Sequence, residues 1–151
     1  MQNKSIAIMQ TWLKVASIIT ILTGLSASLA TFPAGETAWR VLFDILTWPL
    51  DGKPDGFSNT ARALNAVLGG VMAGWGLSIF LLMNNSRIAS FREVYFIILL
   101  SLIFWFIIDS IGSFIAGIPG NVILNIVFLA MFLVPLVVII KKMPARENNA
   151  D

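Results

Sequence analysis

The sequence predicts an all-α membrane protein, with four transmembrane helices in an antiparallel bundle and a short amphipathic helix at the membrane interface. Of its 151 residues, 58% are hydrophobic and 12% are charged, and the mean hydropathy is +0.87; a soluble domain usually carries about 25% charged residues. Four apolar stretches are each long enough to cross a hydrocarbon core, which takes about 20 residues in a helix. Basic residues gather on one side of the resulting four-span layout, which is typical of a membrane protein.

The four predicted spans form a single integral membrane domain over residues 1–151. Pro33 follows the first span, where a helix would stop, and the apolar pattern of that span extends back to about Ser5. An uncharged turn at 117–120 joins the third and fourth spans as a close hairpin, with Asn121 suited to cap the fourth. In chain order we expect spans at about 15–32, 60–83, 94–116 and 121–140, an outer loop at 33–59 that contains the amphipathic helix, and a tail at 141–151.

Basic residues orient the spans. The side with the excess of lysine and arginine is expected to face the cytoplasm, which places both termini inside and the loop at 33–59 outside. The expected location is a cell membrane, of the bacterial inner-membrane type, with the chain crossing it several times. The predicted inner side carries Lys4, Lys14, Arg87, Arg92, Lys141, Lys142 and Arg146, whereas the outer side carries Arg40, Lys53 and Arg62.

The first span has an alternative interpretation as a cleaved signal peptide. Lys4 and Lys14 precede the apolar stretch, and residues 28–30 resemble a small-x-small cleavage site; cleavage would leave three spans. A ladder of small residues at intervals of four instead favours a retained helix that packs closely on its neighbours in lipid. Its members are Ala16, Thr20, Gly24 and Ser28.

Residues 36–49 in the outer loop predict the short amphipathic helix. Polar and apolar residues recur there at helical spacing on opposite faces. We expect this helix to lie on the membrane surface as a cover over the bundle, and a partner-docking or substrate-gating helix is the alternative. The polar face comprises Glu36, Arg40, Asp44 and Thr47, and the apolar face comprises Trp39, Leu42, Phe43 and Leu46.

The second span carries the clearest packing pattern. Gly70 and Gly74 form a Gly-x-x-x-Gly step, and Gly69 lies on an adjacent stripe. Because lipid tails solvate leucine as well as other leucines do, close backbone approach is a major source of helix association in a membrane. The step is compatible with packing against a second copy, but we expect these three glycines to pack within the chain, with Gly24 as the packing glycine of the first span.

Asp109 is the only charge in the run from Val94 to Ala116. It precedes Gly117 by eight residues, which places it about 12 Å below the outer end of its span at about 1.5 Å per residue. A charged aspartate on an isolated span costs about 2.5–3.5 kcal/mol on insertion scales, and Arg62 is within plausible reach as a partner. We therefore expect an outer-leaflet polar layer of ligand or ion-pair candidates, made of Asp109, Arg62, Asn65, Ser113, Asn121 and Asn125.

This polar layer has two interpretations. In the first, buried hydrogen bonds and an ion pair fix the register of the helices. In the second, the layer is a proton relay, an ion site or the polar end of a ligand pocket, since ionisable residues inside a membrane are often functional.

Composition excludes several classes of function. The chain has no His and no Cys, so the usual ligands of haem, iron–sulfur clusters and zinc are missing, as is every nucleophile–histidine pair. We expect no metal, no cofactor and no catalytic residue. No clustered basic face points to nucleic acid.

A small non-enzymatic membrane protein that binds a lipid or a membrane partner is the function that fits best, and it needs only packing faces, a polar site and an amphipathic cover. Its expected partners are the lipid bilayer and a membrane protein or a second copy of the chain. A proton-coupled transporter or channel using Asp109 is the first alternative, although residues 1–83 and 84–151 show no internal repeat of the kind that transporters often have. A lipid-modifying enzyme with Asp109 as general acid or base is the second alternative.

Overall fold

A computed structural model describes residues 2–48 and 51–144. Over these residues the chain is all-helical, which confirms the predicted class, and four of its helices are long and apolar enough to cross a membrane. The elements in chain order are α1 (Gln2–Leu29), α2 (Glu36–Leu46), α3 (Asn59–Asn84), the short 3-10 helix η1 (Ile88–Ser90), α4 (Arg92–Ile115) and α5 (Pro119–Lys142). The four long helices are α1, α3, α4 and α5.

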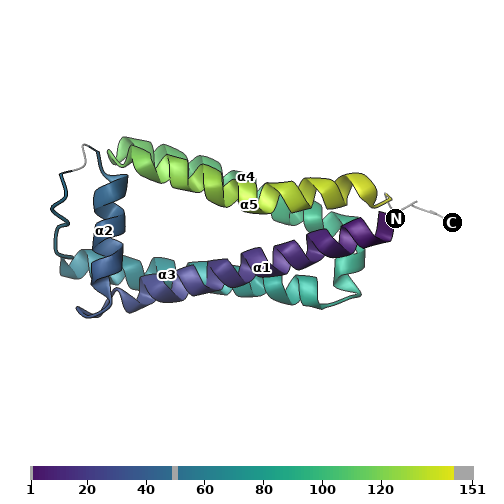
Figure 1. The fold of residues 1–151 in the computed structure, drawn as a ribbon, viewed down its shortest axis with the longest axis horizontal. Helices are drawn as coiled ribbons and strands as arrows, with labels where there is room; N and C mark the ends of the chain where they lie inside the picture. The colour runs from purple at the N-terminus through teal and green to yellow at the C-terminus, as the bar shows by residue number, and fades with distance from the viewer. Residues whose placement is uncertain (1, 49–50, 145–151) are drawn as a thin grey trace.

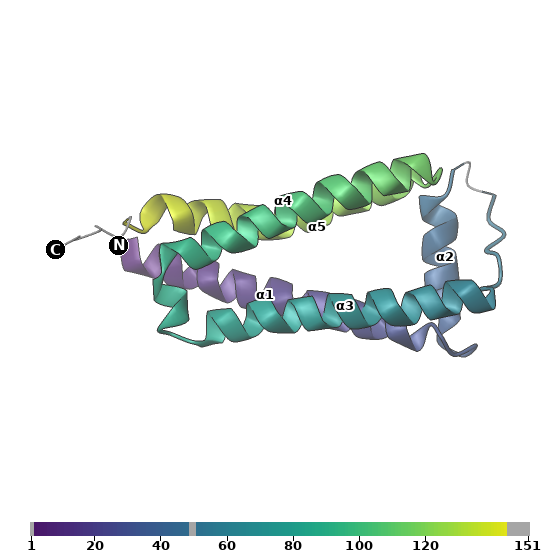
Figure 2. The same cartoon turned by 180° about the vertical axis from the view of Figure 1, so that it is seen from behind.

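The long helices lie in two pairs. Figure 1 shows α1 beside α3 and α4 beside α5, all directed along the long axis of the molecule, with α2 across one end. Between the pairs, α1 packs on α5. Seen from both sides, the pairs are close together at the end where α1 begins and α5 ends, and they diverge toward α2 (Figures 1 and 2). These two ends are called the far end and the α2 end below.

Glycines allow the close approach of α1 and α3. A Cβ atom on Gly24 of α1 would lie 2.5 Å from the backbone nitrogen of Ala73 and 2.6 Å from the carbonyl oxygen of Gly69 in α3. About two turns further along the pair, a Cβ atom on Gly76 would lie 2.9 Å from the carbonyl oxygen of Ser17. The two backbones are thus nearly in contact, which only residues without a side chain permit at these points.

The glycine step predicted to pack within the chain does not do so. A Cβ atom on Gly70 or Gly74 would meet no atom within 4 Å, so both glycines face away from the other described helices. The physical reason is that α3 has one closely packed neighbour, α1, and only one of its two adjacent small-residue stripes can face that neighbour. Gly69 and Gly76 belong to the stripe that does.

The buried core lies toward the far end. Tyr95 and Leu102 of α4 pack there with Phe132, Leu136 and Ile139 of α5, and all five are fully buried. Side chains of α1 and α3 complete this cluster, among them Leu13, Ala16, Ile79 and Met83. The two pairs are therefore held together by apolar packing in the half of the molecule remote from α2.

An aromatic cluster joins the pairs halfway along the helices. Trp75 of α3 packs on Trp105 of α4 and on Phe128 and Phe132 of α5, with ring centroids 5.9, 6.5 and 6.0 Å away. Trp105 and Phe128 also meet edge to face at 5.7 Å. Between this cluster and α2 lies the half of the molecule in which the pairs diverge.

Candidate functional site

Helix α2 is anchored to α3 at one end and to α5 at the other. At its first residue, Glu36 Oε2 lies 2.5 Å from Nη2 of Arg62, and Glu36 is only 7% exposed. The same guanidinium donates through Nη1 to the carbonyl oxygen of Thr31, 3.0 Å away. At the other end of α2, the backbone of Leu46 packs on Gly120, where a Cβ atom would lie 2.6 Å from the Leu46 carbonyl oxygen.

The length of α2 accounts for the divergence of the pairs. Eleven helical residues at about 1.5 Å per residue span about 16 Å, whereas directly packed helices have axes about 8–10 Å apart. Because the two ends of α2 contact different pairs, this helix holds α3 and α5 apart at the α2 end (Figure 2).

Arg40 connects α2 to the segment that follows it. Its Nε donates to the carbonyl oxygen of Asp55 at 2.8 Å and its Nη2 to that of Pro54 at 2.6 Å, and its Nη1 lies 3.6 Å from Glu36. Part of the polar face of α2 is therefore directed at the chain itself rather than at solvent.

Asp44, on the same polar face, has a perturbed carboxyl group. Burial raises the pKa of Asp44, and a hydrogen bond and charge repulsion from Asp51 raise this pKa further. The protonated form of Asp44 is therefore stabilised beside the turn at 51–53.

Asp109 lies in a hydrogen-bonded group formed by α4 and α5. Ser113 Oγ donates to Asp109 Oδ1 at 3.0 Å, and Asn121 Nδ2 lies 3.2 Å from the same oxygen. Asn121 Nδ2 also donates to Ser113 Oγ at 2.8 Å. Among the described residues, no donor bonds Oδ2 and no cationic side chain contacts the carboxylate, so Asp109 retains an open acceptor.

This group faces the other helix pair, just beyond the aromatic cluster. Asp109 lies one helical turn from Trp105, and Asn125 lies about one turn from Phe128, in both cases toward α2. Since Trp105 and Phe128 pack on α3 through their rings, the polar residues share the face that is directed at α3. Asn125 is 4% exposed and its Nδ2 donates to Ser110 Oγ at 3.3 Å.

The structure divides the predicted polar layer into two groups. Asp109, Ser113 and Asn121 come together, with Asn125 beside them. Arg62, expected as the partner of Asp109, instead pairs with Glu36 of α2, whereas Asp109 accepts its hydrogen bonds from Ser113 and from Asn121 of α5.

Asn65 also lies on α3, apart from the Asp109 group. It is 6% exposed, and its side chain makes no hydrogen bond within the described ranges.

Two residues of the site were not among the sequence candidates. The sequence places Glu36 on the polar face of an amphipathic helix, which predicts a solvent-facing side chain. Helical periodicity alone does not reveal that this side chain is buried against α3. Ser110 adjoins Asp109 in the sequence, so its position next to the carboxylate was the available signal.

The arrangement around Asp109 suits the binding of a hydrogen-bond donor. No group of three or more His, Cys, Asp or Glu that could hold a metal ion occurs in the part of the chain that the structure describes. A carboxylate that already accepts two hydrogen bonds on one oxygen can accept a donor from a ligand on the other, or hold a proton there.

No protein-family model, curated protein or solved structure matches this chain.

Proposed function

We propose that this chain is a non-enzymatic membrane protein that binds the polar group of a lipid at Asp109. The proposed protein is an antiparallel bundle of four transmembrane helices in a bacterial inner membrane, with both termini in the cytoplasm and α2 at the outer interface. The distribution of lysine and arginine in the sequence supports this orientation. In it, the Asp109 group lies in the outer leaflet.

The observation that carries the proposal is the span of α2. This helix ends on α3 through Glu36 and on α5 through Leu46, so the two pairs are not packed directly against each other where the Asp109 group faces α3. In a bilayer, lipid tails occupy the surroundings of such diverging helices. A lipid could enter sideways between the pairs, with its tails against apolar helix faces and a hydroxyl, amide or amine near Asp109.

The groups around Asp109 favour binding over catalysis. Ser113 and Asn121 donate to the carboxylate, which fixes its orientation. Acid–base catalysis on a lipid would require a second titratable group near the reacting bond, and the described residues in contact with Asp109 supply only a hydroxyl and an amide.

A proton-coupled transporter is the second candidate, because no cation neutralises Asp109 among the described residues. A carboxylate in this position within a membrane can exchange a proton as its surroundings change. This candidate predicts a proton flux in proteoliposomes that Asp109→Asn abolishes, and the lipid-binding proposal predicts no such flux.

Native mass spectrometry after gentle extraction tests the proposal. We expect the wild-type protein to carry a bound lipid. Asp109→Asn should bind this lipid about tenfold more weakly, which corresponds to the loss of one charge-assisted hydrogen bond. Ser101→Ala is the matched control, since this exposed serine of α4 donates to the carbonyl oxygen of Ile97 in its own helix, 2.9 Å away. Equal lipid retention by the wild type and by Asp109→Asn would overturn the proposal.

A further inference from the structure

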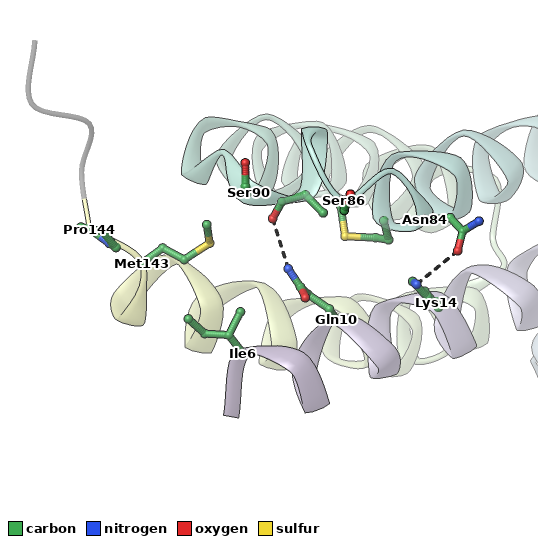
Figure 3. Close-up of a pocket in the computed structure, with 10 residues that line it drawn as sticks. Ile6, Gln10, Lys14, Asn84, Ser86, Ser90, Met143 and Pro144 are labelled. Atoms are coloured by element: carbon green, nitrogen blue, oxygen red, sulfur yellow. Dashed lines mark hydrogen bonds between the residues drawn. The ribbon is translucent and has the colours of Figure 1, made fainter. Parts of the chain in front are cut away.

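We infer that the far end of the protein carries a second binding site, for an anionic phospholipid whose phosphate is held at Lys14. The inference rests on the membrane setting proposed above, but not on the Asp109 group, which lies at the other end of the helices. It starts from a cavity of about 450 Å³ between α1, the end of α3 and the segment around η1. Figure 3 shows this cavity, whose lining includes Ile6, Gln10, Lys14, Asn84, Ser86 and Ser90.

Lys14 supplies the positive charge of the cavity. Its Nζ donates to Asn84 Oδ1 at 3.3 Å (Figure 3), and no described carboxylate forms an ion pair with it. An ammonium group has three donors, and the bond to Asn84 uses one of them. The remaining donors can contact phosphate oxygens, together with the hydroxyl group of Ser86 in the same cavity.

The surroundings of the cavity are strongly basic. The far end carries Lys4, Lys14, Arg87, Arg92, Lys141 and Lys142, whereas Glu93 is the one acidic residue there within residues 2–48 and 51–144. An excess of positive charge raises the local concentration of anionic headgroups.

Hydrogen bonds hold the wall of this cavity in place. Gln10 Nε2 donates to Tyr95 OH at 2.7 Å and to the carbonyl oxygen of Ala89 at 3.1 Å, and Tyr95 OH donates to the same carbonyl at 2.7 Å. These bonds tie α1, η1 and α4 together. The cavity is therefore bounded by a fixed polar junction, which lowers the ordering cost of binding.

An adjoining apolar groove favours a phospholipid over a free phosphate ion. A second cavity of about 580 Å³ lies on the flank of α3 and is lined by Leu81, Leu82 and Ile88 together with Ser78, Asn84 and Asn85. Asn84 borders both cavities. A phospholipid whose phosphate lies at Lys14 would thus place its acyl chains along Leu81 and Leu82. These residues lie at the end of α3, where a membrane-spanning helix reaches headgroup depth.

Lipid titration of the detergent-purified full chain tests this site. Dioleoylphosphatidylglycerol is added to the wild type, to Lys14→Gln and to Lys53→Gln, an exposed lysine of the 51–58 segment that serves as the control. Bound lipid is counted by native mass spectrometry. We expect about tenfold weaker binding for Lys14→Gln, as for the loss of one charge-assisted contact, and wild-type binding for Lys53→Gln.

Two further ligands and two further variants separate the explanations. Dioleoylphosphatidylcholine and inorganic phosphate should bind far more weakly than the anionic lipid, and Leu81→Trp, which fills the groove, should weaken lipid binding even if Lys14→Gln proves unstable. Repeating the comparison of Lys14 with Lys14→Gln in an Asp109→Asn background removes any lipid held at the Asp109 group, so a failure at Asp109 leaves this test intact. Equal binding of the two phospholipids, equal competition by inorganic phosphate, or unchanged binding in both Lys14→Gln and Leu81→Trp would overturn the inference.

Discussion

Glu36 Oε2 and Arg62 Nη2 lie 2.5 Å apart, and this ion pair anchors the first turn of α2 to α3. Glu36 is buried, and Arg62 is also held by the carbonyl oxygen of Thr31. Because the opposite end of α2 packs on Gly120 of α5, one ion pair and one backbone contact set the separation of the two helix pairs at the α2 end.

Loss of this ion pair should destabilise the protein. Glu36→Gln leaves the guanidinium of Arg62 without its anion in a partly buried position, and we expect a loss of about 1–3 kcal/mol in the free energy of unfolding. Thermal unfolding in detergent measures it. Glu93→Gln, at an exposed glutamate of the far end, should change stability by less than about 0.5 kcal/mol; equal effects of the two substitutions would show that α2 is not anchored through Glu36.

The glycines of α3 should differ in their tolerance of alanine. Gly69→Ala places a Cβ atom against the backbone of α1 near Gly24, and we expect a loss of about 1–3 kcal/mol from overpacking. Gly70→Ala, one residue further, meets open space and should be neutral or stabilising by up to about 1 kcal/mol, since alanine favours the helix. Chemical unfolding of both variants decides the matter, and a destabilised Gly70→Ala beside an unaffected Gly69→Ala would contradict the observed packing of α3.

Ser113 and Asn121 should act as one unit with Asp109. Both donate to Asp109 Oδ1 and they bond to each other, so Ser113→Ala and Asn121→Ala should not add in the double variant. We expect a coupling free energy of about 0.5–2 kcal/mol in a double-mutant cycle of thermal unfolding. Strict additivity would mean that these side chains do not meet in the membrane.

Asp44 should make stability depend on pH. Burial, with Asp51 adding to it, raises the pKa of Asp44 in the folded state, so the folded protein holds this proton more tightly than the unfolded chain does. The stabilising contribution is complete below the ordinary carboxyl pKa and is lost as pH rises through the raised value. Asp44→Asn, which imitates the protonated form, should remove this dependence, as unfolding temperatures measured between about pH 3 and 8 would show; an unchanged pH profile would contradict a raised pKa of Asp44 in the folded protein.

Local features of the fold follow from the sequence because they depend on properties of short segments. The length of each apolar run predicts the four long helices. The polar and apolar residues that recur on opposite faces at 36–49 predict α2 (Glu36–Leu46). The depth count from Gly117 likewise places Asp109 at the level of Asn121, which it contacts.

The pairing of helices does not follow from the sequence. Small residues lie on two adjacent stripes of α3, and the sequence does not tell which stripe meets α1; the structure packs Gly69 and leaves Gly70 open. Depth also gives no direction around a helix axis, so Arg62 and Asp109 are at plausible depths for an ion pair yet bind different partners. The contact between Gln10 and Tyr95, which are 85 residues apart, likewise depends on which helix faces pack against each other.

The separation of the helix pairs is open to a direct distance measurement in lipid. The chain has no cysteine, so spin labels can be placed at Val67→Cys with Ile123→Cys near α2, and at Ser78→Cys with Val134→Cys further along the same two helices. Each helix advances by eleven residues between the label sites, about three turns, so the labels point in similar directions. If α2 holds the pairs apart, double electron–electron resonance in nanodiscs will give a clearly longer distance for Val67→Cys/Ile123→Cys than for the other pair; equal distances would contradict the separation on which the Asp109 binding site depends.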